Sequence, residues 1–171
     1  MTRMMRSTRL IAMVFGGWFP YINLLLGSRA SRRMDDYESV VNGVREQVRG
    51  IGCEELTTPE AVDSWIDSQS GLGIVFFNSM CGCAGASARP GLEIALSSER
   101  PDSLVTVFAG TDHEATARMR ERFSSFPPSS PSFLFVKDGV AVELFERDRI
   151  IGRQPADVGS DVVERILTLR E

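Results

Sequence analysis

Two of the three cysteines in this 171-residue chain stand one glycine apart, in the stretch N-S-M-C-G-C-A-G at residues 78–85. Cys81 follows a short apolar run and precedes a segment rich in alanine and leucine, which together predict a strand and then a helix. A cysteine at the start of a helix lies near free backbone N–H groups and the positive end of the helix dipole, and both stabilise a thiolate. The residue types and their spacing therefore predict thiol–disulfide exchange, with Cys81 as the reactive thiolate.

Cys83 is close enough in sequence to form a disulfide with Cys81, provided that the residue between them bends without steric resistance. Gly82 permits such a bend. A metal site is the competing hypothesis, but tetrahedral zinc needs four ligands. Beyond the pair only Cys53 and His113 remain, at no recognisable spacing, so we expect no bound metal, with a cluster bridging two chains left open.

Periodicity and turn residues predict a definite order of elements after Met34. Apolar residues at three- and four-residue steps predict a helix at 37–48, and a capping threonine followed by proline predicts another at 59–68. A proline at position 90 predicts a bend, and Asp138-Gly139 predicts a hairpin turn. The remaining patterns predict strands at 73–77, 104–109, 133–136 and 140–145 and helices at 84–96, 113–123 and 156–169.

This order of elements predicts the fold class. Strand–helix–strand implies two parallel strands joined by a right-handed crossover, and the hairpin adds antiparallel strands to one side of the same sheet. We therefore expect an α/β fold of the thioredoxin-like kind. It is a three-layer sandwich whose mixed central sheet comes from a βαβ unit and then a ββα unit, with additional helices at the N-terminal side.

In such a fold the loop before the hairpin faces the cysteines. A cis bond before Pro131 would expose the backbone of Ser130 for pairing with an extended substrate, so we expect Gly82, Ser130 and Pro131 to bind substrate. An ordinary trans proline in a proline-rich loop is the alternative. Arg89 could attract an anionic thiol substrate or could be solvated, and His113 is expected to be a solvated surface residue.

Composition limits the partners and the compartment. The formal net charge of −4 and the pI near 5.2 speak against a nucleic-acid-binding surface, which is normally basic. Three cysteines are an odd number and too few for the disulfide framework of a small secreted protein, which favours a reducing compartment. We expect Cys53 to be a small core residue or a surface residue without a role.

The first 33 residues form a separate problem. Basic residues precede a mostly apolar run at 10–26, which has the outline of a secretory signal, although Pro20 interrupts the run. Met34 begins M-D-D-Y-E-S-V-V, a plausible domain start, so the alternative is an over-extended gene start. We expect residues 1–33 to be an extension, whether a mis-assigned start, signal-like or disordered, and residues 34–171 to be one thioredoxin-like domain.

With these residues in view, the sequence resembles the bacilliredoxin family of thioredoxin-fold proteins over residues 34–171. The cysteine motif together with its flanking residues is highly specific for the family, whereas C-G-C alone would be weak evidence. In chain order, the motifs that carry the resemblance are E-E-L-T-T-P-E at 54–60, N-S-M-C-G-C-A-G at 78–85, A-R-P-G at 88–91, L-V-T-V-F-A-G at 104–110 and P-P-S-S-P-S at 127–132.

The resemblance implies a thiol–disulfide oxidoreductase that removes low-molecular-weight thiols, bacillithiol above all, from mixed disulfides on other proteins. Cys81 would attack the mixed disulfide and take the small thiol onto its own sulfur. Cys83 is the candidate resolving thiol, and resolution by a second small thiol is the alternative. A protein disulfide isomerase or reductase of the same fold is the second hypothesis, and a metal- or cluster-binding module is the third.

The resemblance also implies partners and a location. The expected co-substrate is bacillithiol or a similar small thiol, with no bound cofactor. The expected partners are S-thiolated client proteins and a reductase that regenerates the thiol, and we expect neither nucleic acid nor membrane. The expected location is cytoplasmic, with export or membrane anchoring as the alternative if residues 1–33 are a real targeting segment.

Overall fold

The computed structural model describes the backbone of residues 19–171 and the side chains of residues 33–171. The described residues fall into two units, which divide between Gly43 and Val44. Helix α1 (Phe19–Gly50) starts in the first unit and ends in the second, so it begins well before the helix that the apolar periodicity predicts. Most of the apolar run at 10–26 lies outside the described residues, and the domain boundary at Met34 stays a prediction.

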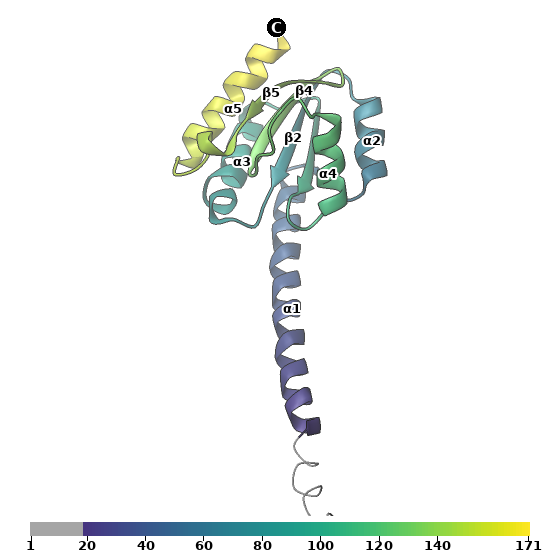
Figure 1. Ribbon diagram of the computed structural model, residues 1–171. Coiled ribbons are helices and arrows are strands. Elements are labelled where there is room, and N and C mark those ends of the chain that lie inside the picture. Colours follow the sequence, from purple (N-terminus) through teal and green to yellow (C-terminus); the bar gives the residue numbers. More distant parts are fainter. Residues whose placement is uncertain (1–18) are drawn as a thin grey trace, which may run out of the picture. The chain divides into compact units, whose positions relative to one another are not determined.

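The second unit is built on one five-stranded mixed sheet with the strand order β1-β3-β2-β4-β5 (Figure 1). β3 runs parallel to β1 and β2, whereas β4 runs antiparallel to β2 and β5. The predicted mixed sheet is therefore confirmed. The strands are β1 (Glu54–Glu55), β2 (Leu72–Asn78), β3 (Ser103–Phe108), β4 (Ser132–Lys137) and β5 (Val140–Phe145).

Helices cover both faces of this sheet, which makes the predicted three layers (Figure 1). On one face lie α2 (Pro59–Ser68) and α4 (His113–Arg122), which pack against each other. On the other face lie α3 (Arg89–Ser98), preceded by the π-helix η1 (Ala84–Ala88), and α5 (Pro155–Arg170). A short 3₁₀ helix, η2 (Arg147–Arg149), links the hairpin to α5.

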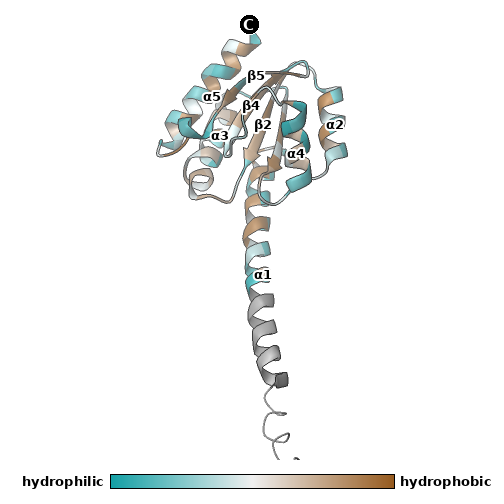
Figure 2. Cartoon of the chain, viewed as in Figure 1, coloured by the Kyte–Doolittle hydropathy of each residue, from teal (hydrophilic) through white to brown (hydrophobic). Residues whose placement is uncertain are grey.

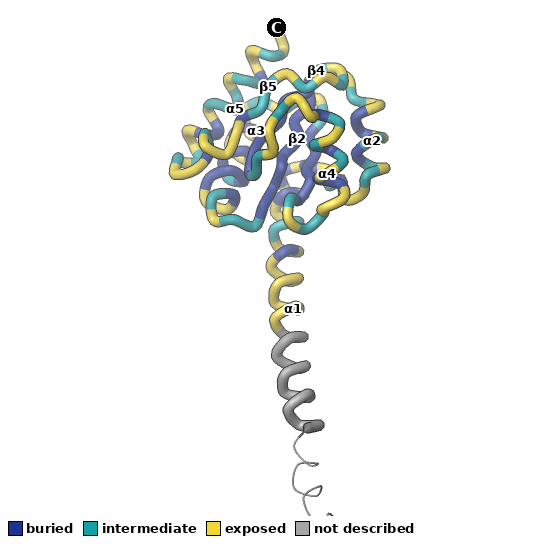
Figure 3. Tube along the Cα trace, viewed as in Figure 1, coloured by how far each residue is buried: buried dark blue, intermediate teal, exposed yellow. Residues whose placement is uncertain are grey.

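The central strands form because their side chains are apolar on both faces. All seven residues of β2 are buried, and Ile74 and Phe76 enter one core while Val75 and Phe77 enter the other. Successive side chains of a strand point to opposite faces, so a continuous apolar run suits a strand covered on both sides. Figures 2 and 3 show these strands as the most hydrophobic and most buried part of the unit.

The turn between β4 and β5 matches the Asp-Gly signal. Asp138 and Gly139 have φ angles of 51° and 77°, and Lys137 pairs with Val140 across the turn. Positive φ at both central residues is the geometry of the two-residue turn that suits the twist of a hairpin. The predicted hairpin is therefore confirmed.

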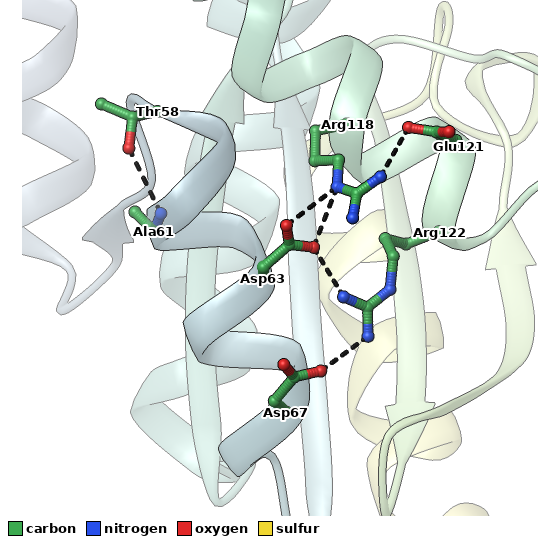
Figure 4. A network of polar contacts seen from close by, with 7 residues as sticks. All are labelled: Thr58, Ala61, Asp63, Asp67, Arg118, Glu121 and Arg122. Carbon is green, nitrogen blue, oxygen red and sulfur yellow. Dashed lines mark hydrogen bonds and ion pairs between the residues drawn. The ribbon is translucent and has the colours of Figure 1, made fainter.

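Polar contacts fix α2 and α4 to each other, as Figure 4 shows. Asp63 of α2 accepts hydrogen bonds from the guanidinium groups of Arg118 and Arg122 of α4, and Asp67 accepts another from Arg122. The hydrogen bonds from Arg118 are the largest cause that holds the pKa of Asp63 below its usual value. At the start of α2, the side chain of Thr58 accepts a hydrogen bond from the Ala61 N–H.

Candidate active site

Cys81 lies between the end of a buried strand and the start of a helix. β2 ends at Asn78, and helical backbone begins at Gly82. The Cys81 Sγ accepts a hydrogen bond from the Ala84 N–H at 3.4 Å and another from the Ser79 hydroxyl at 3.2 Å. The sulfur therefore takes the place of a helix-capping side chain, where backbone N–H groups and the helix dipole favour an anion.

Cys83 stands on the first helical turn, and its sulfur is bonded to that of Cys81 as a disulfide, with the two Cα atoms 5.4 Å apart. Both cysteines are partly exposed, and Gly82 between them is exposed. The φ angle of Gly82 is not in the left-handed region, and a Cβ placed there would meet no atom within 4 Å. The pair can therefore reach a reaction partner in solvent, and the disulfide forms with ordinary backbone geometry at the intervening residue.

The helix after the cysteines opens with a wide turn. The Arg89 N–H bonds to the Ala84 carbonyl, five residues back, where a regular α-helix would reach only four back. Pro90 has no N–H to donate to the preceding turn, so the regular ladder is broken there in any case. The predicted interruption at Pro90 thus takes the form of a π-helical turn, and the chain remains helical through it.

Arg89 is not a solvated surface residue, because it is only 8 % exposed and all its hydrogen-bond partners belong to the protein. It donates to Gln47 Oε1 at 2.9 Å, to Asn78 Oδ1 at 3.2 Å and to the Ser79 carbonyl at 3.1 Å. Burial lowers the pKa of this guanidinium from its usual value. Both alternatives that the sequence suggested for Arg89 place it at the surface, and both are wrong in that respect.

The Ser130–Pro131 peptide is cis. Ser132 pairs with Phe77 across β4 and β2, so Ser130 and Pro131 precede β4 at the same end of the sheet where Asn78 leads out of β2 to the cysteines. An open groove runs beside this loop, with walls that contain Ser129, Ser130, Arg120, Arg147 and Ile151. The lining of this groove includes Ser130 but neither Gly82 nor Pro131, and the substrate-binding role of these three residues stays a prediction.

Comparison with known proteins identifies the family. Residues 37–168 match the family model described as "Disulphide isomerase". A bacilliredoxin of Symbiobacterium thermophilum is 46 % identical over 127 residues, which cover 74 % of this chain and 91 % of that protein. A bacilliredoxin of Bacillus cereus is 51 % identical over 120 residues, which cover 70 % of this chain and 83 % of that protein.

The chain belongs to the bacilliredoxin family.

Among solved structures, a thioredoxin mutant of Entamoeba histolytica covers 68 % of this bacilliredoxin and 98 % of its own chain, at 16 % identity and a TM-score of 0.47. The thioredoxin-like fold assignment follows from the strand order, with its parallel βαβ unit and antiparallel hairpin. Together with the paired cysteines, membership of the family makes this chain a thiol–disulfide oxidoreductase.

The third cysteine of this bacilliredoxin lies apart from the exchange site. Cys53 is 4 % exposed within the core, and burial raises its pKa to about 12, so its sulfur stays a protonated thiol at neutral pH. His113 is the exposed first residue of α4, as expected. In the part of the chain that the structure describes, no three histidine, cysteine or acidic side chains gather as a metal site.

Sequence reasoning expected backbone N–H groups near the reactive sulfur, as Ala84 provides, but it missed a second donor, the Ser79 hydroxyl. The serine two residues before Cys81 was the available signal, because its hydroxyl is within reach of a side chain two positions further along a tight loop.

None of the helices that the structure describes is both long enough and apolar enough to span a bilayer.

Proposed function

We propose that this bacilliredoxin removes bacillithiol, or a similar low-molecular-weight thiol, from mixed disulfides on client proteins. The observation that carries the proposal is the position of Cys81, whose sulfur receives two hydrogen bonds at the start of a helix and has the sulfur of Cys83 within bonding distance. The names of its relatives, bacilliredoxins of two genera, supply the substrate class.

The reaction begins with the reduced protein. The Cys81 thiolate attacks the sulfur of the small thiol in the mixed disulfide, a new S–S bond forms, and the client leaves as its thiolate. The Cys83 thiolate then attacks the Cys81 sulfur, which releases the small thiol and leaves the Cys81–Cys83 disulfide. Two electrons from an external thiol reductant restore the dithiol. Alternatively, a second small thiol attacks Cys81 directly and Cys83 is not needed.

The helix start contributes to each step through the sulfur anion. The Ala84 N–H and the Ser79 hydroxyl donate to Cys81 Sγ, so they stabilise the thiolate both as the attacking group and as the group that leaves when the disulfide is reduced. The backbone of Ser130 would pair with the extended client segment around the modified cysteine, in the groove whose lining includes Ser129 and Arg147.

The decisive experiment presents a purified client that carries one bacillithiol to the reduced protein and to two variants. We expect Cys81→Ser to release no bacillithiol, and we expect Cys83→Ser to perform the first step and to retain the small thiol on Cys81, which mass spectrometry detects. Cys53→Ser is the matched control and should match the parent. Release by Cys81→Ser at the parent rate would overturn the assignment.

The second candidate function is protein disulfide isomerisation, and the description of the matching family model favours it. An isomerase must act on a client without any small thiol attached. We therefore compare release of bacillithiol with recovery of activity by a client whose disulfides are scrambled. Faster action on the scrambled client would make isomerisation the main activity.

We further propose a cytoplasmic location, with a reductase and a small-thiol pool as partners. A cysteine pair that must return to the dithiol form after each cycle needs a reducing compartment. N-terminal sequencing of the natural protein tests the location, because a first residue at Met34 would exclude a secretory signal in the preceding 33 residues.

A further inference from the structure

Arg89 is a buried cation whose hydrogen-bond acceptors are all neutral. Its three acceptors are the side-chain amides of Gln47 and Asn78 and the backbone carbonyl of Ser79. Within the described residues no carboxylate forms an ion pair with it, in contrast to Arg45, whose guanidinium contacts two carboxylates. A buried charge is costly unless an opposite charge compensates it, so its presence next to a redox site suggests an anion that forms during the reaction.

A short path of hydrogen bonds joins Arg89 to the reactive sulfur. Arg89 Nη1 donates to the Ser79 carbonyl, and the same nitrogen donates to Asn78 Oδ1, which also accepts the Ser79 N–H at 2.9 Å. Ser79 is thus held at both its N–H and its carbonyl. Its remaining polar group, the hydroxyl, donates to Cys81 Sγ at 3.2 Å.

We propose that Arg89 is a positioning residue of the exchange site: it holds Ser79 in the place from which the hydroxyl donates to Cys81, and its charge favours the anionic form of that sulfur. Ser79 links the guanidinium to the sulfur through two hydrogen bonds, one at its carbonyl and one at its hydroxyl. Both Ser79 and Arg89 are buried, so salt screens the charge of the guanidinium only weakly along this path. The inference rests on the proposed exchange chemistry at Cys81.

Gly85 offers a way to move the guanidinium without removing its charge. A Cβ built at Gly85 would stand 2.9 Å from Arg89 Nη2, closer than nonbonded atoms approach. The guanidinium is held by three acceptors, so it cannot yield without lengthening the bond to Ser79 or the bonds to its neighbours. Gly85→Ala therefore perturbs the position of Arg89, whereas Arg89→Gln removes the charge itself.

The test measures the rate at which iodoacetamide alkylates Cys81 as a function of pH, in the full reduced chain with Cys83→Ser. In Arg89→Gln we expect the rate at pH 7 to fall about three- to tenfold, because the midpoint of the pH profile moves up by about half a unit to one unit, while the limiting rate at high pH is retained. Arg89→Lys should restore part of the loss. Ser79→Ala and Gly85→Ala should each move the midpoint in the same direction by a smaller amount.

Arg170→Gln is the matched control, because it removes one arginine near the C-terminus, whose side chain pairs with Glu99. It should leave the profile unchanged. A midpoint for folded Arg89→Gln equal to that of the parent would overturn the proposal. If circular dichroism shows that Arg89→Gln does not fold, Ser79→Ala and Gly85→Ala decide the test. An unchanged midpoint of the pH profile in both variants would then overturn the proposal.

This assay uses neither a client nor bacillithiol, so it separates the two proposals. A protein that shows the expected shifts but releases no bacillithiol contradicts the proposed function and leaves the role of Arg89 standing. A protein that releases bacillithiol with the same profile in every variant contradicts the role of Arg89 alone.

Discussion

Cys53 should make the stability of the folded protein fall at high pH. Its thiol is 4 % exposed, and desolvation is the largest cause that raises its pKa from 9.0 to about 12. Nearby Arg100 opposes this rise, and Glu55 adds to it. In the unfolded chain the thiol returns to its ordinary pKa, so between pH 9 and pH 12 the unfolded state loses a proton that the folded state keeps.

The sign and size of the effect follow from this difference in bound protons. The contribution of Cys53 to stability is fully present below about pH 9 and is lost as the pH rises toward 12, at up to about 1.4 kcal/mol per pH unit. Between pH 9 and pH 11 the free energy of unfolding should therefore fall by about 2 kcal/mol more in a protein with Cys53 than in one without it.

The assay is urea unfolding at pH 8, 9, 10 and 11, monitored by circular dichroism, on a pair of proteins with and without Cys53→Ala. Both proteins also carry Cys81→Ser and Cys83→Ser, so that no disulfide exchange occurs at high pH. Lysines and tyrosines titrate equally in the pair, and the small cavity left by alanine shifts the stability by a constant amount. Equal pH slopes for the two proteins would refute the reasoning.

Three further substitutions test the packing and the caps. Gly91→Ala places a Cβ 2.9 Å from that of Val158, so it should destabilise the contact between α3 and α5 by about 1–3 kcal/mol in urea unfolding, and no loss would show that the two helices can move apart freely. Thr58→Ala removes the hydrogen bond from the Ala61 N–H and should cost about 1 kcal/mol, measured as a lower melting temperature; an unchanged melting temperature would count against the cap. Gly82→Ala adds a methyl group in open space, so the disulfide should still form and stability should change by less than about 0.5 kcal/mol, whereas loss of the disulfide under oxidising conditions would contradict the geometry.

Much of the fold was predictable because each element has its own local pattern. The apolar run at 73–77 lies within β2, and the Asp138-Gly139 pair lies in the hairpin turn. The helix predicted at 59–68 matches α2, which has the capping threonine and the first-turn proline that favoured it. Cys81 could be placed at a helix start for the same reason, since the strand and helix patterns meet there.

The features that were not predictable depend on partners far along the chain. β1 has two residues, too few for any periodicity, and it is a strand only because it pairs with β3. Arg89 is buried because Gln47, 42 residues earlier, and the loop before Cys81 supply its acceptors. No local sequence pattern around Arg89 indicates that its guanidinium is buried.

The strands that adjoin the two loops of the exchange site lie inside the sheet, and this position bears on how the molecule tolerates repeated oxidation and reduction. β2 leads to the cysteines and β4 follows the Ser130–Pro131 loop, and each strand has a neighbour on both sides. Their amides open only when the whole unit unfolds, so their hydrogen exchange should be slowest in both redox states. Electrons thus enter and leave at the helix start that carries Cys81 and Cys83, and we expect the two strands that adjoin the exchange site to keep their pairing through each cycle.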